Sequence, residues 1–178
     1  MIDWISEAKG IVLFGAGISS AVAMDLHHRL LRLGLEVKYV EDTQTQYALA
    51  ALMGNGDVGV FVSYSGRTSS TIRAASIARE RDSRIVAVTA QPNSPLGRIA
   101  QLTMTTPGGV GLFGNDAAMT RMLQILLNEI IFHCLAVRDV SRLQNTRRID
   151  TILADDKIPD HRETSVRTRK KKRQGHDE

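Results

Sequence analysis

Short apolar runs alternate with segments of helical spacing along most of the chain. The first run, Ile11–Phe14, is apolar throughout and ends at a glycine, which predicts a buried strand. The next segment, Ser19–Leu33, repeats its apolar residues on one helical face, and Gly34 follows where helices commonly end. The same alternation predicts further strands at Glu36–Val40, Val58–Ser63, Ile85–Thr89 and Gln101–Thr105, and further helices at Gln44–Met53, Thr68–Arg81, Pro95–Ala100, Asp116–Val137 and Ser141–Leu153.

Strands that are apolar throughout and separated by helices predict a parallel sheet covered on both faces. With right-handed crossovers, the expected fold class is α/β: a three-layer α/β/α sandwich with a five-stranded parallel sheet, flavodoxin-like in architecture. Ligands of such folds bind at the carboxyl ends of the strands. The loops that follow each strand are therefore the places to search for chemistry.

The chain has 178 residues, of which 43% are apolar, enough for one domain with a proper core. Neither a long uncharged apolar stretch nor a basic leader is present, so we expect no membrane contact and a cytoplasmic protein. The single cysteine, Cys134, cannot form an internal disulfide, and its apolar neighbours predict a buried thiol.

The net charge of +4 is concentrated at one end of the chain. Eight of the 23 Lys and Arg and four of the 19 Asp and Glu lie from Lys157 onward, which leaves 15 residues of each sign before it. We therefore expect a neutral domain over residues 1–154 and a basic, disordered tail over residues 155–178. The basic balance does not indicate a DNA-binding face on the domain.

The first candidate loop joins the first strand to the first long helix. Gly15 and Gly17 allow tight turns and close approach of a ligand, and the helix N-terminus that follows favours an anion. Ser19 either donates its hydroxyl to that anion or caps the helix, and the loop alone leaves both interpretations open. A dinucleotide fingerprint fails at its last glycine, where Ser20 stands.

The loop after the third strand is richer in donors. Six Ser and Thr residues fall within nine positions, from Ser63 to Thr71. Ser63 ends the strand, Gly66 turns the chain and Thr68 opens the next helix, so Ser65 lies among converging hydroxyl and N–H groups. Because phosphate offers several acceptor oxygens, we favour phosphate binding over a plain serine-rich cap.

These motifs resemble the SIS (sugar isomerase) domain family. The resemblance rests on GAGISS after the first strand, SYSGRT after the third and IVAVTAQPNSPLGRIAQLTM at the fourth, and it extends over about residues 4 to 153. It implies that Ser19, Ser63, Ser65 and Thr68 bind the phosphate of a sugar phosphate. Trp4-Ile5 and Ser94-Pro95-Leu96 resemble segments of one branch, the RpiR-type transcription regulators.

The family contains both isomerases and sensors. Isomerisation of a sugar needs a general base, usually a carboxylate. Thr120 and Gln124 resemble the pattern around that base, but Ile125 stands where phosphoheptose isomerases have glutamate, and Thr120-Arg121 resembles the Ser-Arg pair of RpiR-type sensors. Glu129 and His133 share a helix face and fit a structural pair at a subunit contact better than an acid/base pair. We expect no catalytic residue, metal or cofactor.

The sequence thus favours a sugar-phosphate-sensing effector domain of an RpiR-type regulator. The alternative is an aldose–ketose sugar-phosphate isomerase. RpiR-type regulators carry an N-terminal helix-turn-helix domain that this chain lacks, so we expect DNA contact only through that missing domain. The long apolar helix over Thr120–Val137 needs a partner, which predicts a homodimer or homotetramer.

Overall fold

The computed structural model of the chain describes residues 1–111 and 114–155. The chain divides into a unit spanning Met1–Thr146 and a second that begins at Arg147. The predicted basic tail lies, apart from its first residue, outside the described residues.

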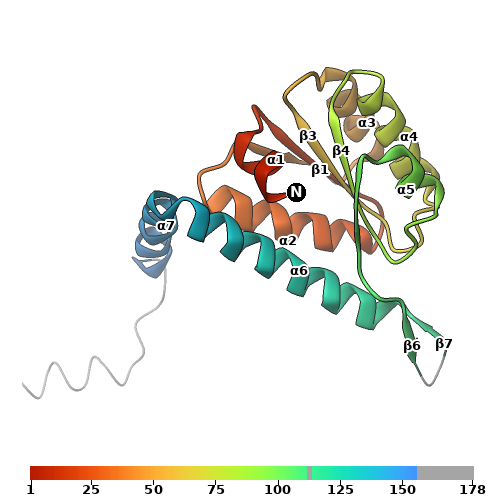
Figure 1. Cartoon of the computed structure of the whole chain (residues 1–178). Coiled ribbons are helices and arrows are strands. Elements are labelled where there is room, and N and C mark those ends of the chain that lie inside the picture. The colour runs from red at the N-terminus through yellow and green to blue at the C-terminus, as the bar shows by residue number, and fades with distance from the viewer. Residues whose placement is uncertain (112–113, 156–178) are drawn as a thin grey trace, which may run out of the picture. The chain divides into compact units, whose positions relative to one another are not determined.

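Five strands form one parallel sheet, as the pattern of apolar runs predicted (Figure 1). Their order across the sheet is β2-β1-β3-β4-β5, and every neighbouring pair is parallel. Since parallel strands need crossover connections, a helix follows each of the first four strands. The strands are β1 (Ile11–Gly15), β2 (Val37–Tyr39), β3 (Val58–Val62), β4 (Arg84–Thr89) and β5 (Leu102–Thr105).

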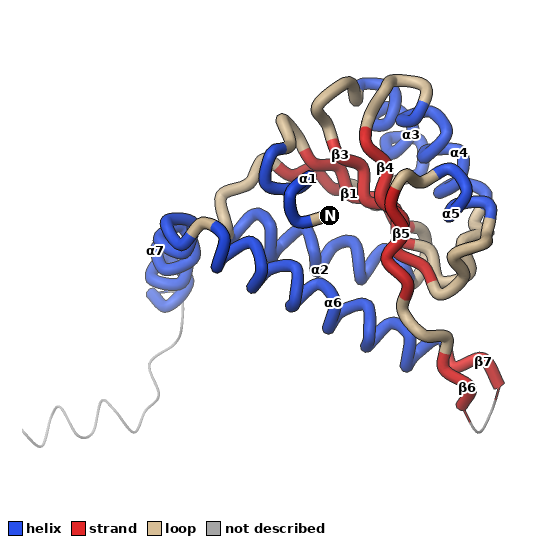
Figure 2. Tube along the Cα trace, in the orientation of Figure 1, coloured by secondary structure: helices blue, strands red, loops and turns tan. Residues whose placement is uncertain are grey.

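Helices cover both faces of the sheet, which confirms the three-layer sandwich (Figure 2). One face packs against α1, α2 and α6, and the other against α3, α4 and α5. The helices are α1 (Ile2–Glu7), α2 (Ser19–Arg32), α3 (Thr43–Leu52), α4 (Ser69–Arg79), α5 (Pro95–Ile99), α6 (Ala117–Arg138) and α7 (Leu143–Asp155), with a short 3-10 helix at Val140–Arg142.

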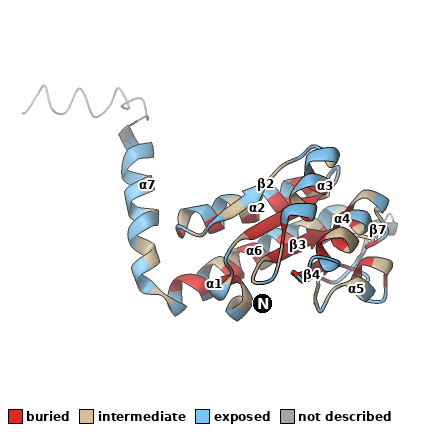
Figure 3. Ribbon diagram, turned by 90° about the horizontal axis from the view of Figure 1, so that it is seen from above, coloured by how far each residue is buried: buried red, intermediate tan, exposed pale blue. Residues whose placement is uncertain are grey.

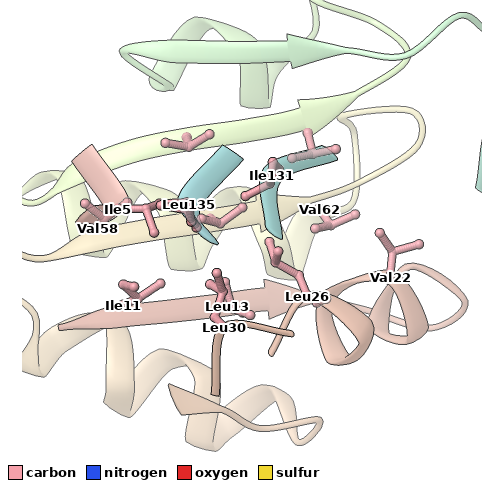
Figure 4. Close-up of a cluster of buried hydrophobic side chains, with 14 of the residues drawn as sticks. Ile5, Ile11, Leu13, Val22, Leu26, Leu30, Val58, Val62, Ile131 and Leu135 are labelled. Atoms are coloured by element: carbon pink, nitrogen blue, oxygen red, sulfur yellow. The ribbon is translucent and has the colours of Figure 1, made fainter. Parts of the chain in front are cut away.

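Alternation along the strands divides the core into two halves. Ile11 and Leu13 of β1 face α2 and α6, where Leu26 and Ile131 are also buried (Figure 4). Burying each such aliphatic side chain stabilises the fold by about 1.5–3 kcal/mol. On the opposite face the rings of Phe14 and Phe61 stack with centroids 4.3 Å apart. The central strands β3 and β4 are almost wholly buried, as Figure 3 shows.

The structure adds elements that the sequence analysis did not predict. Helix α1 precedes the first strand, and β6 (Gly109–Gly111) pairs with β7 (Gly114–Asp116) in an antiparallel hairpin ahead of α6. Both elements are short, so neither contains enough residues for a clear period.

The prediction of a buried thiol at Cys134 is wrong, because that residue is exposed. Helix α6 is apolar on its inner and outer faces, and Cys134 lies on the outer one while its neighbour Leu135 is buried. A helix that is apolar all round gives no sequence signal for which face meets the core. Among the described residues, α6 is long and apolar enough to cross a membrane by length and composition alone, a test that core helices of soluble proteins also pass.

A candidate anion-binding site at the carboxyl rim of the sheet

The first loop of the site connects β1 to α2 in a tight turn that needs its glycines. A Cβ atom on Gly15 would lie 2.7 Å from the backbone oxygen of Ser19, closer than side chains approach. Gly17 has a φ of +55°, in the left-handed region that favours glycine. The backbone of β1 therefore runs directly beneath the first turn of α2.

The hydroxyl groups of this turn differ in what they contact. Ser19 is the first residue of α2, and the residue at the N-cap position is Ile18, which has no side chain able to cap. The structure thus does not show the serine N-cap that was the alternative interpretation of Ser19. The half-buried Ser19 hydroxyl makes no hydrogen bond within the described residues, whereas that of Ser20 donates to the carbonyl of Gly17 at 2.5 Å.

The second loop connects β3 to α4. Ser63 is buried, and its hydroxyl oxygen lies 3.1 Å from that of Thr68. Thr68 occupies the N-cap position of α4, yet its side chain does not bond to the helix. Their mutual hydrogen bond uses only one of the two hydroxyl protons, so one O–H donor remains for a ligand. The Ser65 hydroxyl accepts from the backbone N–H of Arg67 at 3.2 Å and keeps its own proton.

Gly66 fixes the shape of this loop. Its φ is +61°, and an added Cβ atom would lie 1.9 Å from the Ser94 hydroxyl oxygen. Its carbonyl accepts from the N–H of Leu96 at 3.1 Å. The segment after β4 therefore braces the loop, and the Thr89 hydroxyl adds a bond to the Tyr64 carbonyl at 3.1 Å.

The two loops start side by side. Strands β1 and β3 are neighbours, and Gly15 pairs with Val62 in their register. Because paired strands lie about 4.8 Å apart, the residues that follow both strands start at the same level of the rim. The structure thus brings together the regions of all seven predicted ligand-binding residues, which are Gly15, Gly17, Ser19, Ser63, Ser65, Gly66 and Thr68.

Gln46 of α3 supports the first loop, and the sequence analysis missed it. The residue is buried, and its Nε2 donates to the carbonyls of Gly15 at 2.9 Å, Val40 at 3.0 Å and Glu41 at 3.3 Å. These bonds join the ends of two strands to one side chain. The available signal was a polar residue at a core position of an otherwise apolar helix, which is ambiguous without the fold.

The rim also carries one carboxylate that contacts the first loop. Glu41 follows β2, and its Oε1 lies 3.5 Å from the Ser20 hydroxyl oxygen. The side chain is exposed, so it is accessible to a bound molecule. Chemically, the rim offers hydroxyl donors, the N-termini of α2 and α4, and this carboxylate. Donors of this kind suit an oxyanion such as phosphate.

The pair of Glu129 and His133 lies away from this rim. The two side chains are 2.8 Å apart on α6, and Glu129 also pairs with Arg29 of α2. Arg29 in turn bonds to Asp25 at 2.9 Å, which raises the pKa of the guanidinium. This network ties two helices together, as the structural interpretation of the pair anticipated. Burial lowers the pKa of His27, which faces Tyr39 rather than the candidate site.

Two hollows described in the structure also lie away from the two loops. One of about 390 Å³ is lined by residues of the same charged network, including Asp25, Arg29 and Glu129. The other, of about 120 Å³, lies at the amino ends of the strands, beside Lys9 and Asp57. Neither is lined by the predicted ligand-binding residues.

Comparison with known proteins identifies the family. A sequence model of the SIS domain matches residues 4–134, so this chain belongs to the SIS domain family. Vibrio vulnificus NanR, solved in complex with ManNAc-6P, is similar with a TM-score of 0.82 and 25% identity, over 89% of this chain and 60% of that chain. This chain therefore spans about three fifths of the length of NanR.

Two further structures show how broadly the fold is used. The sugar isomerase domain of an RpiR transcription factor from Sphaerobacter thermophilus has a TM-score of 0.74 and 26% identity, over 84% of this chain and 83% of that chain. A Methanococcus jannaschii protein, for which a 3-hexulose-6-phosphate isomerase function has been inferred, has a TM-score of 0.69 at 23% identity, over 82% of this chain and 80% of that chain. The fold thus occurs in regulators and isomerases alike.

Proposed function

We propose that this chain is the sugar-phosphate-sensing effector domain of an RpiR-type transcription regulator. The observation that carries the proposal is the pair of adjacent rim loops, whose hydroxyl groups keep free protons beside two helix N-termini. NanR, solved with a phosphosugar, and the RpiR transcription factor, at 25% and 26% identity, support this class of ligand.

In the proposed complex, one phosphate group bridges the two loops. Ser63, Ser65 and Thr68 donate hydrogen bonds to its oxygens, and Ser19 donates from the opposite loop. Gly15, Gly17 and Gly66 allow the backbone to approach the ligand closely. The dipoles of α2 and α4 add favourable electrostatic energy for a dianion.

The regulatory step requires a second subunit. Exposed apolar residues along α6 support a homodimer or homotetramer, because such a stripe is costly to leave in water; they are Met119, Met122, Ile125, Leu126 and Ile130. Binding of the sugar phosphate would shift the packing between subunits and so the spacing of attached DNA-binding domains, which lie outside this sequence. We place the protein in the cytoplasm, where phosphorylated sugars occur.

The proposal is tested by measuring binding with and without Ser65. Isothermal titration with ManNAc-6P, arabinose 5-phosphate, fructose 6-phosphate and inorganic phosphate should show binding to the wild-type chain. Ser65→Ala should weaken it about tenfold, because a hydrogen bond to a charged group contributes about 1.5–3 kcal/mol. Ser76→Ala, two turns into α4, is the matched control and should bind as the wild type does. Equal affinities for all three proteins would refute the phosphate site.

One observation favours isomerase activity as a second candidate function. The exposed carboxylate of Glu41 reaches the first loop and is a possible general base. Glu41→Gln keeps the hydrogen bond with Ser20 and removes the base. Aldose–ketose interconversion of a bound sugar phosphate by the wild type, abolished in Glu41→Gln, would establish the isomerase. Binding without turnover would support the sensor.

A further inference from the structure

Gln124 of α6 has a buried carboxamide with no partner. The residue is 0% exposed, and neither its Nε2 nor its Oε1 makes a hydrogen bond within the described part of the chain. A buried amide without partners destabilises a fold, because its hydrogen bonds with water are lost and not replaced. An apolar side chain of similar size would pack at this position at lower cost.

The position of Gln124 follows from its neighbours on the same helix face. Thr120, one turn before it, donates to the carbonyl of Pro107 at 3.2 Å, just beyond the carboxyl end of β5. Asn128, one turn after it, donates to the carbonyl of Val22 at 2.9 Å, in the first turns of α2. Both helices therefore start at the carboxyl rim and run side by side (Figure 2). Gln124 lies between these two contacts, level with the start of α2 at Ser19.

Asn128 shows what a structural amide on this face looks like. It is 1% exposed, and its Nδ2 donates to the Val22 carbonyl and to Asp25 Oδ2, both at 2.9 Å. Asn128 thus fastens α6 to α2. Gln124 has the same chemistry one turn nearer the rim and fastens nothing, so packing and helix attachment leave it unexplained.

We propose that Gln124 binds hydroxyl groups of the sugar whose phosphate occupies the rim loops. This inference rests on the proposed function and adds a residue that selects the sugar. A carboxamide offers an acceptor and two donors, and a sugar hydroxyl both donates and accepts, so the two groups are matched. The glutamine reaches the ligand by a change of rotamer toward Ser19. That change breaks no hydrogen bond to the described residues and gains new ones.

The test compares a sugar phosphate with inorganic phosphate. Gln124→Met removes the amide and keeps the length of the side chain. For whichever of ManNAc-6P, arabinose 5-phosphate and fructose 6-phosphate binds the wild type best, affinity should fall about ten- to a hundredfold, the range expected when a buried polar partner is lost. Affinity for inorganic phosphate should stay within about twofold, and the unfolding midpoint should not fall. Gln124→Leu repeats the test with a different apolar shape.

Asn128→Leu is the matched control. It should lower the unfolding midpoint, because it breaks two hydrogen bonds, and leave the ratio of the two affinities unchanged. An unchanged ratio in Gln124→Met and Gln124→Leu would overturn the inference while Ser65→Ala still reported on the phosphate site. An equal loss for both ligands would also overturn it, since the loop rather than the sugar would then be affected. A wild-type chain that binds none of the four ligands would remove the proposed function and the inference together.

Discussion

Replacing Gly66 with alanine introduces one methyl group at the tightest point of the candidate site. The new Cβ atom would lie 1.9 Å from the Ser94 hydroxyl oxygen and 2.5 Å from the Ser94 Cβ. The residue would also have to keep a φ of +61°, which alanine rarely adopts. The substitution therefore combines a steric overlap with a conformational penalty, and both effects act on the loop that holds Ser63, Ser65 and Thr68.

The two penalties have different sizes. Holding a non-glycine residue in the left-handed region costs about 1–2 kcal/mol. Forcing an extra carbon into a packed site costs about 1–3 kcal/mol, because neighbouring groups must move. Gly66→Ala should therefore lower the free energy of unfolding by about 2–5 kcal/mol. This is a large fraction of the roughly 5–15 kcal/mol typical of a domain.

Two other glycines separate these effects. Gly17 has a φ of +55° and no atom within 4 Å of an added Cβ, so Gly17→Ala should show only the conformational cost of about 1–2 kcal/mol. Gly54 has neither a positive φ nor a close neighbour. Gly54→Ala should therefore change stability by no more than about 1 kcal/mol. Urea unfolding followed by circular dichroism measures all three variants.

A fourth protein tests the origin of the overlap. Ser94→Gly removes the group that the new methyl would meet and also the hydroxyl that accepts from the backbone N–H of Gly97 at the start of α5. Gly66→Ala should be less destabilising in the Ser94→Gly background than in the wild type, by about 1–3 kcal/mol. Additive effects of the two changes would refute the argument from overlap. A cost for Gly66→Ala no greater than that for Gly17→Ala would refute it as well.

Two more predictions concern the supports of the first loop. Gln46→Met should lower the free energy of unfolding by about 1–3 kcal/mol, because buried carbonyls at the strand ends lose their donor, and Gln46→Leu should do the same in urea unfolding. Hydrogen bonds from the side chain and backbone of Thr45 lower the pKa of Asp42 below its ordinary 3.8. A depressed folded-state pKa stabilises the fold above the unfolded-state pKa and loses that effect as pH falls through the folded-state value. Asp42→Ala should thus lower the unfolding midpoint at pH 7 and progressively less below pH 3.8, and a pH-independent difference would contradict this.

Much of this architecture could be read from local patterns. The apolar runs at the five strands predicted the parallel sheet, since each run is buried on both faces. The serine-rich loop after β3 was recognised because its residues are contiguous. The pattern failed at Cys134, where an apolar helix presents two faces and only one meets the core. It also gave no choice between Ile18 and Ser19 as the N-cap of α2.

Residue order therefore specifies which segments become strands, helices and polar turns in this chain, because these depend on spacing over a few positions. Contacts between distant segments were decided only by folding. Gln46 reaches the Gly15 carbonyl 31 positions away, and Asn128 reaches the Val22 carbonyl 106 positions away. The same packing leaves the Gln124 amide without a partner among the described residues. Such pairings depend on how helices dock on a sheet, and no local period encodes the docking.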